Sequence, residues 1–184
     1  VLLNYQGTLH DVFTLAHEMG HALHSWYSDE HQPYIYAGYR IFVAEVASTC
    51  NEALLIHYLM EQSKKAGDRK KTMYLMNYFL EQFRTTLFRQ TMFAEFEKIT
   101  HGLQEQGETL TADRLCEIYY DLNKLYFGEE ICVDQEIAME WARIPHFYTP
   151  FYVYQYATGF SAAIALSKQI LEQGAPAVEQ YKKF

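Results

Sequence analysis

The chain has 184 residues, enough to bury a sizeable core. Its 23 acidic and 15 basic residues give a net charge of -8, which excludes a general electrostatic attraction to nucleic acid or to anionic membrane surfaces. Glycine and proline are sparse while tyrosine and phenylalanine are abundant, so the composition favours a helical protein with aromatic packing or an aromatic-lined cleft.

Apolar residues recur at helical spacing along almost the whole chain, and strand-like alternation is hard to find. The pattern therefore predicts a mainly α, multi-helix fold, which we interpret as one helical domain over residues 1–184. The expected helices cover, in chain order, residues 8–27, 40–63, 69–101, 111–127, 133–143 and 150–172, and Pro176 would open another.

Local signals set several of these helix boundaries. Gly67 marks the end of the second helix, and Thr111 caps the start of the fourth. Gly128 closes that fourth helix. Pro150 suits the first turn of the last complete helix, because a proline at that position loses no helical hydrogen bond.

The stretch "TLAHEMGHALHSW", residues 14–26, concentrates histidines on the first expected helix. Residues four apart share one helix face, so His17 and His21 can direct two imidazoles to one point. Glu18 lies about 100 degrees further round, where it can reach a metal-bound water without being a ligand. Gly20 is costly inside a helix and suggests close backbone packing. The segment predicts a metal site, the alternative being a histidine-rich face without metal.

A catalytic zinc needs a third protein ligand and an open fourth position, and the sequence offers three candidates. His24 shares the histidine face but lies a turn further along. One straight helix rarely supplies three ligands, so we expect His24 to support the site or the packing. Glu45 and Glu52 lie two turns apart on the second helix among apolar residues, where carboxylates are costly unless paired or bound to a cation. Spacing alone does not decide which carboxylate touches the metal.

The stretches "LLNYQGTLHDVFTLAHEMGHALHSWYS" and "QPYIYAGYRIFVAEVASTCNEALL" closely resemble the catalytic core of the oligoendopeptidase F group. That group belongs to the thimet oligopeptidase (M3) family of zinc metallopeptidases. The resemblance implies one Zn²⁺ per chain, held by His17, His21 and Glu45. It also implies that Glu52 orients a ligand histidine, and His24 matches a further histidine of the family motif.

A second candidate cluster lies downstream in "IPHFYTPFYVYQYATGFSAA", where His146 is followed closely by four tyrosines. Tyrosines at four-residue spacing are typical of an aromatic core stripe. A zinc hydrolase, however, also needs hydrogen-bond donors for the oxyanion of its tetrahedral intermediate. The segment resembles a family region that contacts substrate and transition state, so His146 and Tyr152 are predicted to be catalytic, with Tyr154 next.

Taken with the resemblance, the sequence predicts a zinc-dependent endopeptidase that hydrolyses internal bonds of short oligopeptides with zinc-activated water. Glu18 would be the general base. Family members are much longer, so the chain is expected to be a partial catalytic domain that lacks the N-terminal half and the extreme C-terminus. The missing N-terminal half of the same polypeptide would complete a substrate channel, and its absence would leave apolar surface exposed. Neither nucleic acid nor membrane is an expected partner.

The three cysteines, Cys50, Cys116 and Cys132, are odd in number and include no C-x-x-C pair. This usage argues against a disulfide framework and for a reducing compartment, so we expect buried thiols and a cytoplasmic location. No apolar run approaches the length of a membrane span, and no leader pattern is present. Because the chain begins at Val1 rather than Met, it is expected to start within a longer polypeptide.

Two other functions remain open from the sequence. A zinc aminopeptidase shares the ligand set of two histidines and one glutamate, but would call for a motif that recognises a free amino terminus, of which we find no trace. An isolated helical fragment could also bind zinc without turnover. Three ligands with an open position argue against a purely structural zinc, which usually closes with four.

Overall fold

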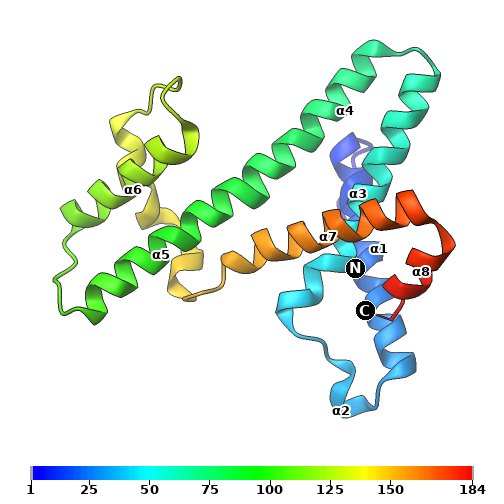
Figure 1. The fold of residues 1–184 in the computed structure, drawn as a ribbon, viewed down its shortest axis with the longest axis horizontal. Helices are drawn as coiled ribbons and strands as arrows, with labels where there is room; N and C mark the ends of the chain where they lie inside the picture. The colour runs from blue at the N-terminus through cyan, green and yellow to red at the C-terminus, as the bar shows by residue number, and fades with distance from the viewer. Residues whose placement is uncertain (1, 184) are drawn as a thin grey trace. The chain divides into compact units, whose positions relative to one another are not determined.

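The computed structural model describes residues 2–183, and within that range every regular element is helical, which confirms the predicted mainly α fold (Figure 1). No helix in residues 2–183 combines the length and apolar character needed to cross a bilayer. The elements are α1 (Leu9–His31), α2 (Tyr34–Ala37), α3 (Ile41–Lys65), α4 (Arg69–Gln82), the π-helix η1 (Phe83–Phe88), α5 (Arg89–Glu105), α6 (Ala112–Phe127), the 3-10 helices η2 (Gln135–Arg143) and η3 (Pro145–Tyr148), α7 (Tyr154–Gln173) and α8 (Ala175–Tyr181).

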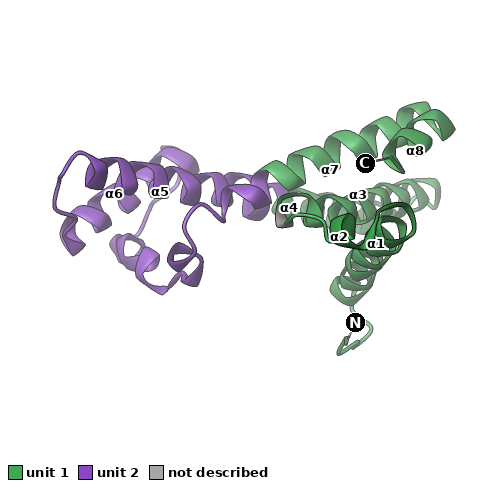
Figure 2. Cartoon of the chain, turned by 90° about the horizontal axis from the view of Figure 1, so that it is seen from below, with its two compact units in different colours: residues 1–82, 158–184 green, residues 83–157 purple. Residues whose placement is uncertain are grey.

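The helices form two compact units (Figure 2). Unit 1 joins Val1–Gln82 to Thr158–Phe184, so it combines the first four helices with most of α7 and with α8. Unit 2 is the intervening segment Phe83–Ala157. The first unit is therefore built from segments far apart in the sequence.

In unit 1, the start of α1 is fixed by its own side chains. The Asp11 amide donates to Thr8 Oγ1 over 3.3 Å, and Asp11 Oδ2 accepts from the Thr8 amide over 2.8 Å. This reciprocal capping box satisfies donors that the first helical turn leaves unpaired. The helix then continues to His31, beyond the end predicted from the sequence.

Helix α1 packs closely against α3, and Gly20 sets the distance between them. A Cβ atom at Gly20 would lie 2.5 Å from Ser48 Cα and 2.9 Å from the Ala47 carbonyl oxygen, which is too close for any side chain. The predicted reason for a glycine within this helix is thereby confirmed. The close approach aligns the histidine face of α1 with the carboxylates of α3.

Apolar side chains hold unit 1 together around the α1–α3 pair. One cluster joins α1 and α3 to α4, and a second joins α3 to α7. Their buried members are Phe13, Ile56, Met60 and Leu75 in the first and Val46, Cys50 and Ala163 in the second. Within α3 these buried residues recur at helical spacing, so the apolar pattern of the sequence could indicate the helix that carries them.

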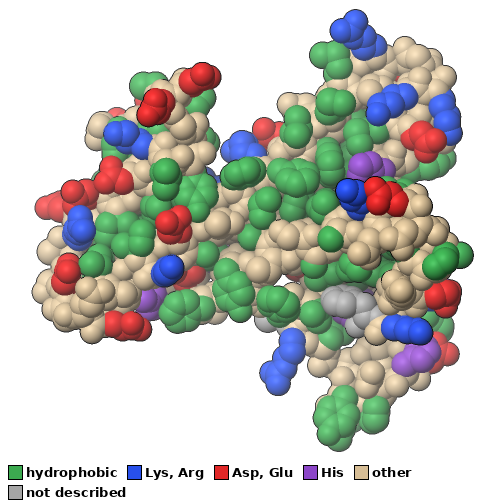
Figure 3. Space-filling model, viewed as in Figure 1, with side chains coloured by type: hydrophobic (Ala, Val, Ile, Leu, Met, Phe, Trp, Pro, Cys, Tyr) green, Lys and Arg blue, Asp and Glu red, His purple; other side chains and the backbone are tan. Residues whose placement is uncertain are grey.

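Hydrophobic side chains of unit 1 are also exposed, notably over α2 and α4 (Figure 3). Tyr34 is 96% and Ile35 is 76% exposed on α2, and Met73 is 61% exposed on α4. Exposed apolar surface was expected from the sequence, and patches of this kind are typical of surfaces that other chain segments or molecules cover.

Unit 2 is organised by α5 and α6 around an aromatic core. Its buried residues are Met92, Phe93, Phe96, Ile118, Tyr119, Leu122, Ile144 and Val153. Within this core, the buried Glu140 of η2 accepts from Arg89 over 2.5 Å and from the Tyr119 hydroxyl over 2.6 Å. One carboxylate therefore links η2 to α5 and α6. Thr111 and Gly128 cap α6 as predicted.

Several boundaries differ from the sequence predictions. The helix expected over 69–101 contains a π-helical segment, and the helix expected over 133–143 is a 3-10 helix. The predicted helix start at Pro150 is wrong, because Phe151 has a φ of 60°, which no right-handed helix accepts, and α7 begins at Tyr154. Of the three cysteines expected to be buried, Cys50 is buried, Cys116 is partly buried, and Cys132 is exposed in the segment between α6 and η2.

Candidate metal centre

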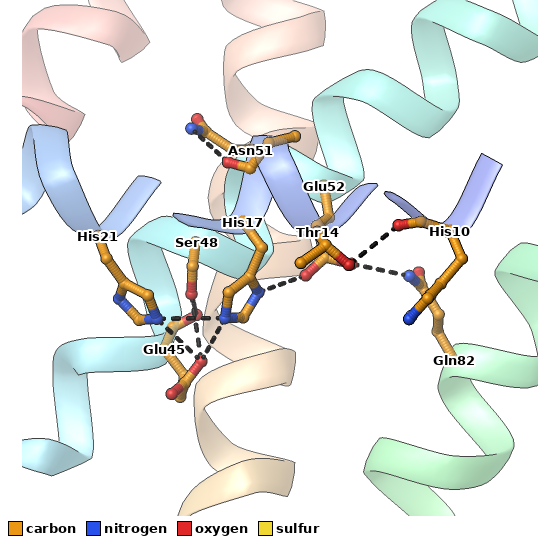
Figure 4. A network of polar contacts seen from close by, with 10 residues as sticks. His10, Thr14, His17, His21, Glu45, Ser48, Asn51, Glu52 and Gln82 are labelled. Carbon is orange, nitrogen blue, oxygen red and sulfur yellow. Dashed lines mark hydrogen bonds and ion pairs between the residues drawn. The ribbon is translucent and has the colours of Figure 1, made fainter. Parts of the chain in front are cut away.

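Helix α1 brings His17 and His21 together as their spacing predicts. Their Nε2 atoms lie 3.1 Å apart, and the ring planes are nearly perpendicular with centroids 4.8 Å apart. The two rings therefore present their Nε2 atoms to one point on the face of α1 that packs against α3 (Figure 4).

Glu45 of α3 completes this group. Its Oε2 lies 3.2 Å from His17 Nε2 and 3.6 Å from His21 Nε2. The Ser48 hydroxyl donates to the same Oε2 over 3.2 Å, which holds the carboxylate in place. One atom from each of His17, His21 and Glu45 lies within 4.8 Å of the others, which is close enough for all three to reach one metal ion.

Glu52, two turns further along α3, occupies a different position. Its Oε1 lies 2.5 Å from His17 Nδ1, the ring nitrogen that faces away from the group of three (Figure 4). A carboxylate that accepts from Nδ1–H leaves the Nε2 lone pair for a metal. The structure therefore separates the two carboxylates that the sequence could not tell apart.

The two carboxylates control the charge of His17. Burial lowers the pKa of His17, but hydrogen bonds and negative charge from Glu45 and Glu52 outweigh burial and raise it to about 10. The hydrogen bond to His17, opposed by burial, holds the pKa of Glu45 below its usual range. Without metal, His17 therefore carries a proton at neutral pH, and its positive charge offsets part of the negative charge of the two carboxylates. A cation bound at Nε2 would replace that proton, since metal binding requires a neutral ring.

The donor set suits zinc. Two imidazole nitrogens and one carboxylate oxygen form a ligand set typical of catalytic zinc, with a fourth position left for water. The side chains of His17 and Glu45 are 26% and 33% exposed, so solvent reaches the group. The residues present therefore fit a zinc ion with one open position.

The other histidine of α1, His24, lies outside the group of three. Its ring stacks on Tyr39 with centroids 3.8 Å apart and planes 8° apart, and the Tyr39 hydroxyl is 2.9 Å from Ser25 Oγ. This contact joins α1 to the segment between α2 and α3. His24 thus packs α1 against the segment that leads into α3. Glu18 is half-buried on α1 beside His17.

The downstream cluster forms within unit 2. His146 of η3 stacks on Tyr152 with ring centroids 5.9 Å apart, and its Nε2 lies 3.4 Å from the Tyr156 hydroxyl. Tyr154, the next tyrosine along the chain, is 42% exposed. The third ring that packs in this cluster belongs to Tyr156, which the sequence analysis did not propose as a functional residue. Its position four residues after Tyr152 is the sequence feature that could have indicated it.

Residues 1–184 match the family model described as Peptidase family M3. The match covers the whole chain, so the chain belongs to peptidase family M3.

Curated proteins named as oligopeptidases are similar to the chain over most or all of its length. The chain is 55% identical over 184 residues to oligopeptidase PepF of Bacillus subtilis (strain 168), covering all of the chain and 27% of that protein. It is 50% identical over 171 residues to the chromosomal oligoendopeptidase F of Lactococcus lactis subsp. cremoris, covering 93% of the chain and 28% of that protein. The chain thus spans less than a third of the length of these relatives.

Among solved structures, oligoendopeptidase-F from Enterococcus faecium matches with a TM-score of 0.81 and 47% identity, over 94% of this chain and 31% of that one. A putative peptidase from Chlamydophila abortus matches with a TM-score of 0.88 and 45% identity, over 98% of this chain and 30% of that one.

Proposed function

We propose that the chain carries the zinc site of an endopeptidase that hydrolyses internal bonds of short oligopeptides. The convergence of His17, His21 and Glu45 carries this proposal. A second support is Glu52 on His17 Nδ1, since an outer carboxylate that orients a ligand histidine is a common feature of zinc sites.

In the proposed mechanism His17 Nε2, His21 Nε2 and a Glu45 oxygen hold one zinc ion per chain. When bound, zinc polarises a carbonyl and makes a water acidic enough to attack near neutral pH. The Glu18 carboxylate takes the proton of the attacking water and returns it to the leaving amine. Glu18 suits this role because it follows a ligand on α1 without joining the group of three.

Donors for the oxyanion are proposed from the cluster in unit 2. His146 and Tyr152 are the first candidates, because their rings are already held against each other, and Tyr154 is the next. The Tyr156 hydroxyl on His146 Nε2 would then fix the orientation of that ring.

The proposed substrates are short, unstructured peptides, in keeping with the names of the relatives. We further propose that an N-terminal half of the same polypeptide completes the substrate channel, as the greater length of the relatives suggests. A cytoplasmic location is proposed from the free cysteines. A zinc aminopeptidase and a fragment without turnover remain the competing functions.

Two substitutions test the proposal, with an end-blocked fluorogenic peptide as substrate and zinc per molecule measured after dialysis. Glu45→Ala should lose most of the zinc and the hydrolysis. Glu18→Gln should keep the zinc but lose about 100-fold or more in turnover, because only the proton acceptor is removed. Two exposed glutamates on the same helices, Glu30 and Glu61, provide matched controls as Glu30→Gln and Glu61→Ala.

Each outcome has a definite meaning. A reconstituted parent without zinc would contradict the metal site, and full zinc retention by Glu45→Ala would contradict the assigned third ligand. Unchanged turnover in Glu18→Gln would exclude the proposed general base. Hydrolysis restricted to peptides with a free amino terminus would favour an aminopeptidase, and zinc without hydrolysis of either peptide would favour the fragment without turnover.

A further inference from the structure

Glu52 has a second partner besides His17. The side-chain amide of Gln82, the last residue of α4, donates through Nε2 to Glu52 Oε2 over 3.1 Å (Figure 4). The other oxygen, Oε1, lies 2.5 Å from His17 Nδ1. The two oxygens of one carboxylate therefore connect α4 to α1 through α3.

The surroundings of Glu52 explain why the second partner matters. The Glu52 side chain is only 17% exposed. Nearby Tyr78, whose ring stacks on Phe13 with centroids 4.7 Å apart, has a raised pKa because of burial and then of the Glu52 charge. A carboxylate in such surroundings is stable only when its oxygens are paired. With a single partner it could rotate away from the orientation that meets Nδ1.

The chemical type of the partner is also informative. An amide donates a hydrogen bond without carrying charge, so it fixes the direction of the carboxylate and leaves its negative charge to act on His17. A lysine or arginine at this position would neutralise Glu52 and weaken its hold on Nδ1–H. Gln82 is thus suited to orienting the Glu52 carboxylate rather than to neutralising its charge.

The place of Gln82 in its helix is also particular. The α-helical hydrogen-bond pattern of α4 ends at Gln82, and the π-helical segment η1 begins at Phe83. Segments of π-helix are uncommon in proteins, and many of those that do occur lie at functional sites. The change of helix type therefore falls directly after the residue that donates to Glu52.

We infer that Gln82 is a positioning residue of the metal centre, which acts on His17 through Glu52 and so raises the affinity of the site for zinc. This inference rests on the proposed zinc function. It adds a third helix, α4, to the two that carry the ligands.

The test is the zinc affinity of the protein, measured by competition with a chromophoric chelator. Gln82→Met keeps the volume of the side chain and removes its donor, and should weaken zinc binding by about tenfold, the lower end of the range for residues that support a ligand. The matched control is Gln62→Met, at an exposed glutamine on α3. It should bind zinc as the parent does.

A double-mutant cycle separates positioning from a general effect on folding. In a Glu52→Ala background, Gln82→Met should have no further effect on zinc affinity, because Gln82 acts through the carboxylate. The His17 Nδ1–H proton resonance of the zinc-loaded protein should also move in Gln82→Met but not in Gln62→Met. Where Gln82→Met fails to fold, Gln82→Asn keeps an amide on a shorter side chain and allows the same comparison.

Parental zinc affinity in a folded Gln82 variant would overturn the inference and leave the zinc site intact. An equal loss with and without Glu52 would also overturn it, by showing that Gln82 acts only on packing. A parent protein that takes up no zinc would instead contradict the proposed function itself.

Discussion

At the scale of single residues, the geometry of one helix places the histidines of the metal centre, and the packing of two helices places its carboxylates. The interval between His17 and His21 was enough to place both imidazoles on one face, because helix geometry alone fixes that relation. The roles of Glu45 and Glu52 were not predictable from spacing. They lie on the same face of α3, and only the position of α1 across that face decides which carboxylate meets Nε2 and which meets Nδ1.

Gly20 is the residue that fixes this position of α1. We expect Gly20→Ala to lower the free energy of unfolding by about 1–3 kcal/mol, because the new Cβ would lie 2.5 Å from Ser48 Cα and the two helices must separate. The same substitution should also lower the affinity for zinc, since the proposed ligands come from both helices. Urea denaturation and chelator competition measure the two effects.

A second glycine provides the control for this substitution. Gly102 lies within α5, and a Cβ there would meet no other atom within 4 Å. Gly102→Ala should therefore raise the free energy of unfolding, by up to about 1 kcal/mol, through helix propensity alone. Equal effects of the two substitutions would contradict the packing explanation for Gly20.

At the scale of elements, helices were predictable and the turn before α7 was not. Periodicity indicates where apolar faces recur, but it carries no information on single φ angles. The turn depends on a tertiary contact: the Phe151 amide donates to Glu97 of α5 over 3.0 Å, and its ring lies 4.7 Å from that of His101. These contacts hold Phe151 at a φ of 60°, against the local preference for a helix that Pro150 suggested.

Unit 2 depends on Glu140 of η2, which joins α5 and α6. Burial raises the pKa of Glu140, but the Arg89 and Tyr119 hydrogen bonds outweigh burial and hold it below the usual 4.5. Glu140→Gln should lower the free energy of unfolding at pH 7 by about 2 kcal/mol, since the hydrogen bonds from Arg89 and Tyr119 lose their charged acceptor. Urea denaturation of parent and variant measures this difference.

The pH dependence of this difference follows from the direction of the shift. A carboxyl with a lower pKa in the folded state stabilises the fold above its unfolded pKa and loses this contribution as the pH falls through the folded value. The gap between parent and Glu140→Gln should therefore narrow as the pH drops below 4.5. Glu117→Gln, which alters an exposed ion pair with Arg114, should show little gap at any pH.

At the scale of the whole molecule, composition and periodicity predicted a helical protein but gave no sign of two compact units. Unit 1 unites Val1–Gln82 with Thr158–Phe184, and no local pattern reports that segments so far apart in the sequence pack together. The sequence also did not indicate which unit would hold the proposed zinc ligands. The proposed zinc ligands, with Glu52 and Gln82, all belong to unit 1.

This distribution predicts that zinc stabilises the two units unequally. A ligand that binds only the folded state stabilises it by about 2.7 kcal/mol when its free concentration is 100 times its dissociation constant. Because all three proposed ligands lie on α1 and α3, amide hydrogen exchange should slow in these helices when zinc is added and recover with a chelator. Amides of α6, which unit 2 holds through its own aromatic core, should exchange at the same rate with and without zinc. Equal protection of α3 and α6 would mean that the units unfold together, and no protection of either would contradict binding at this site.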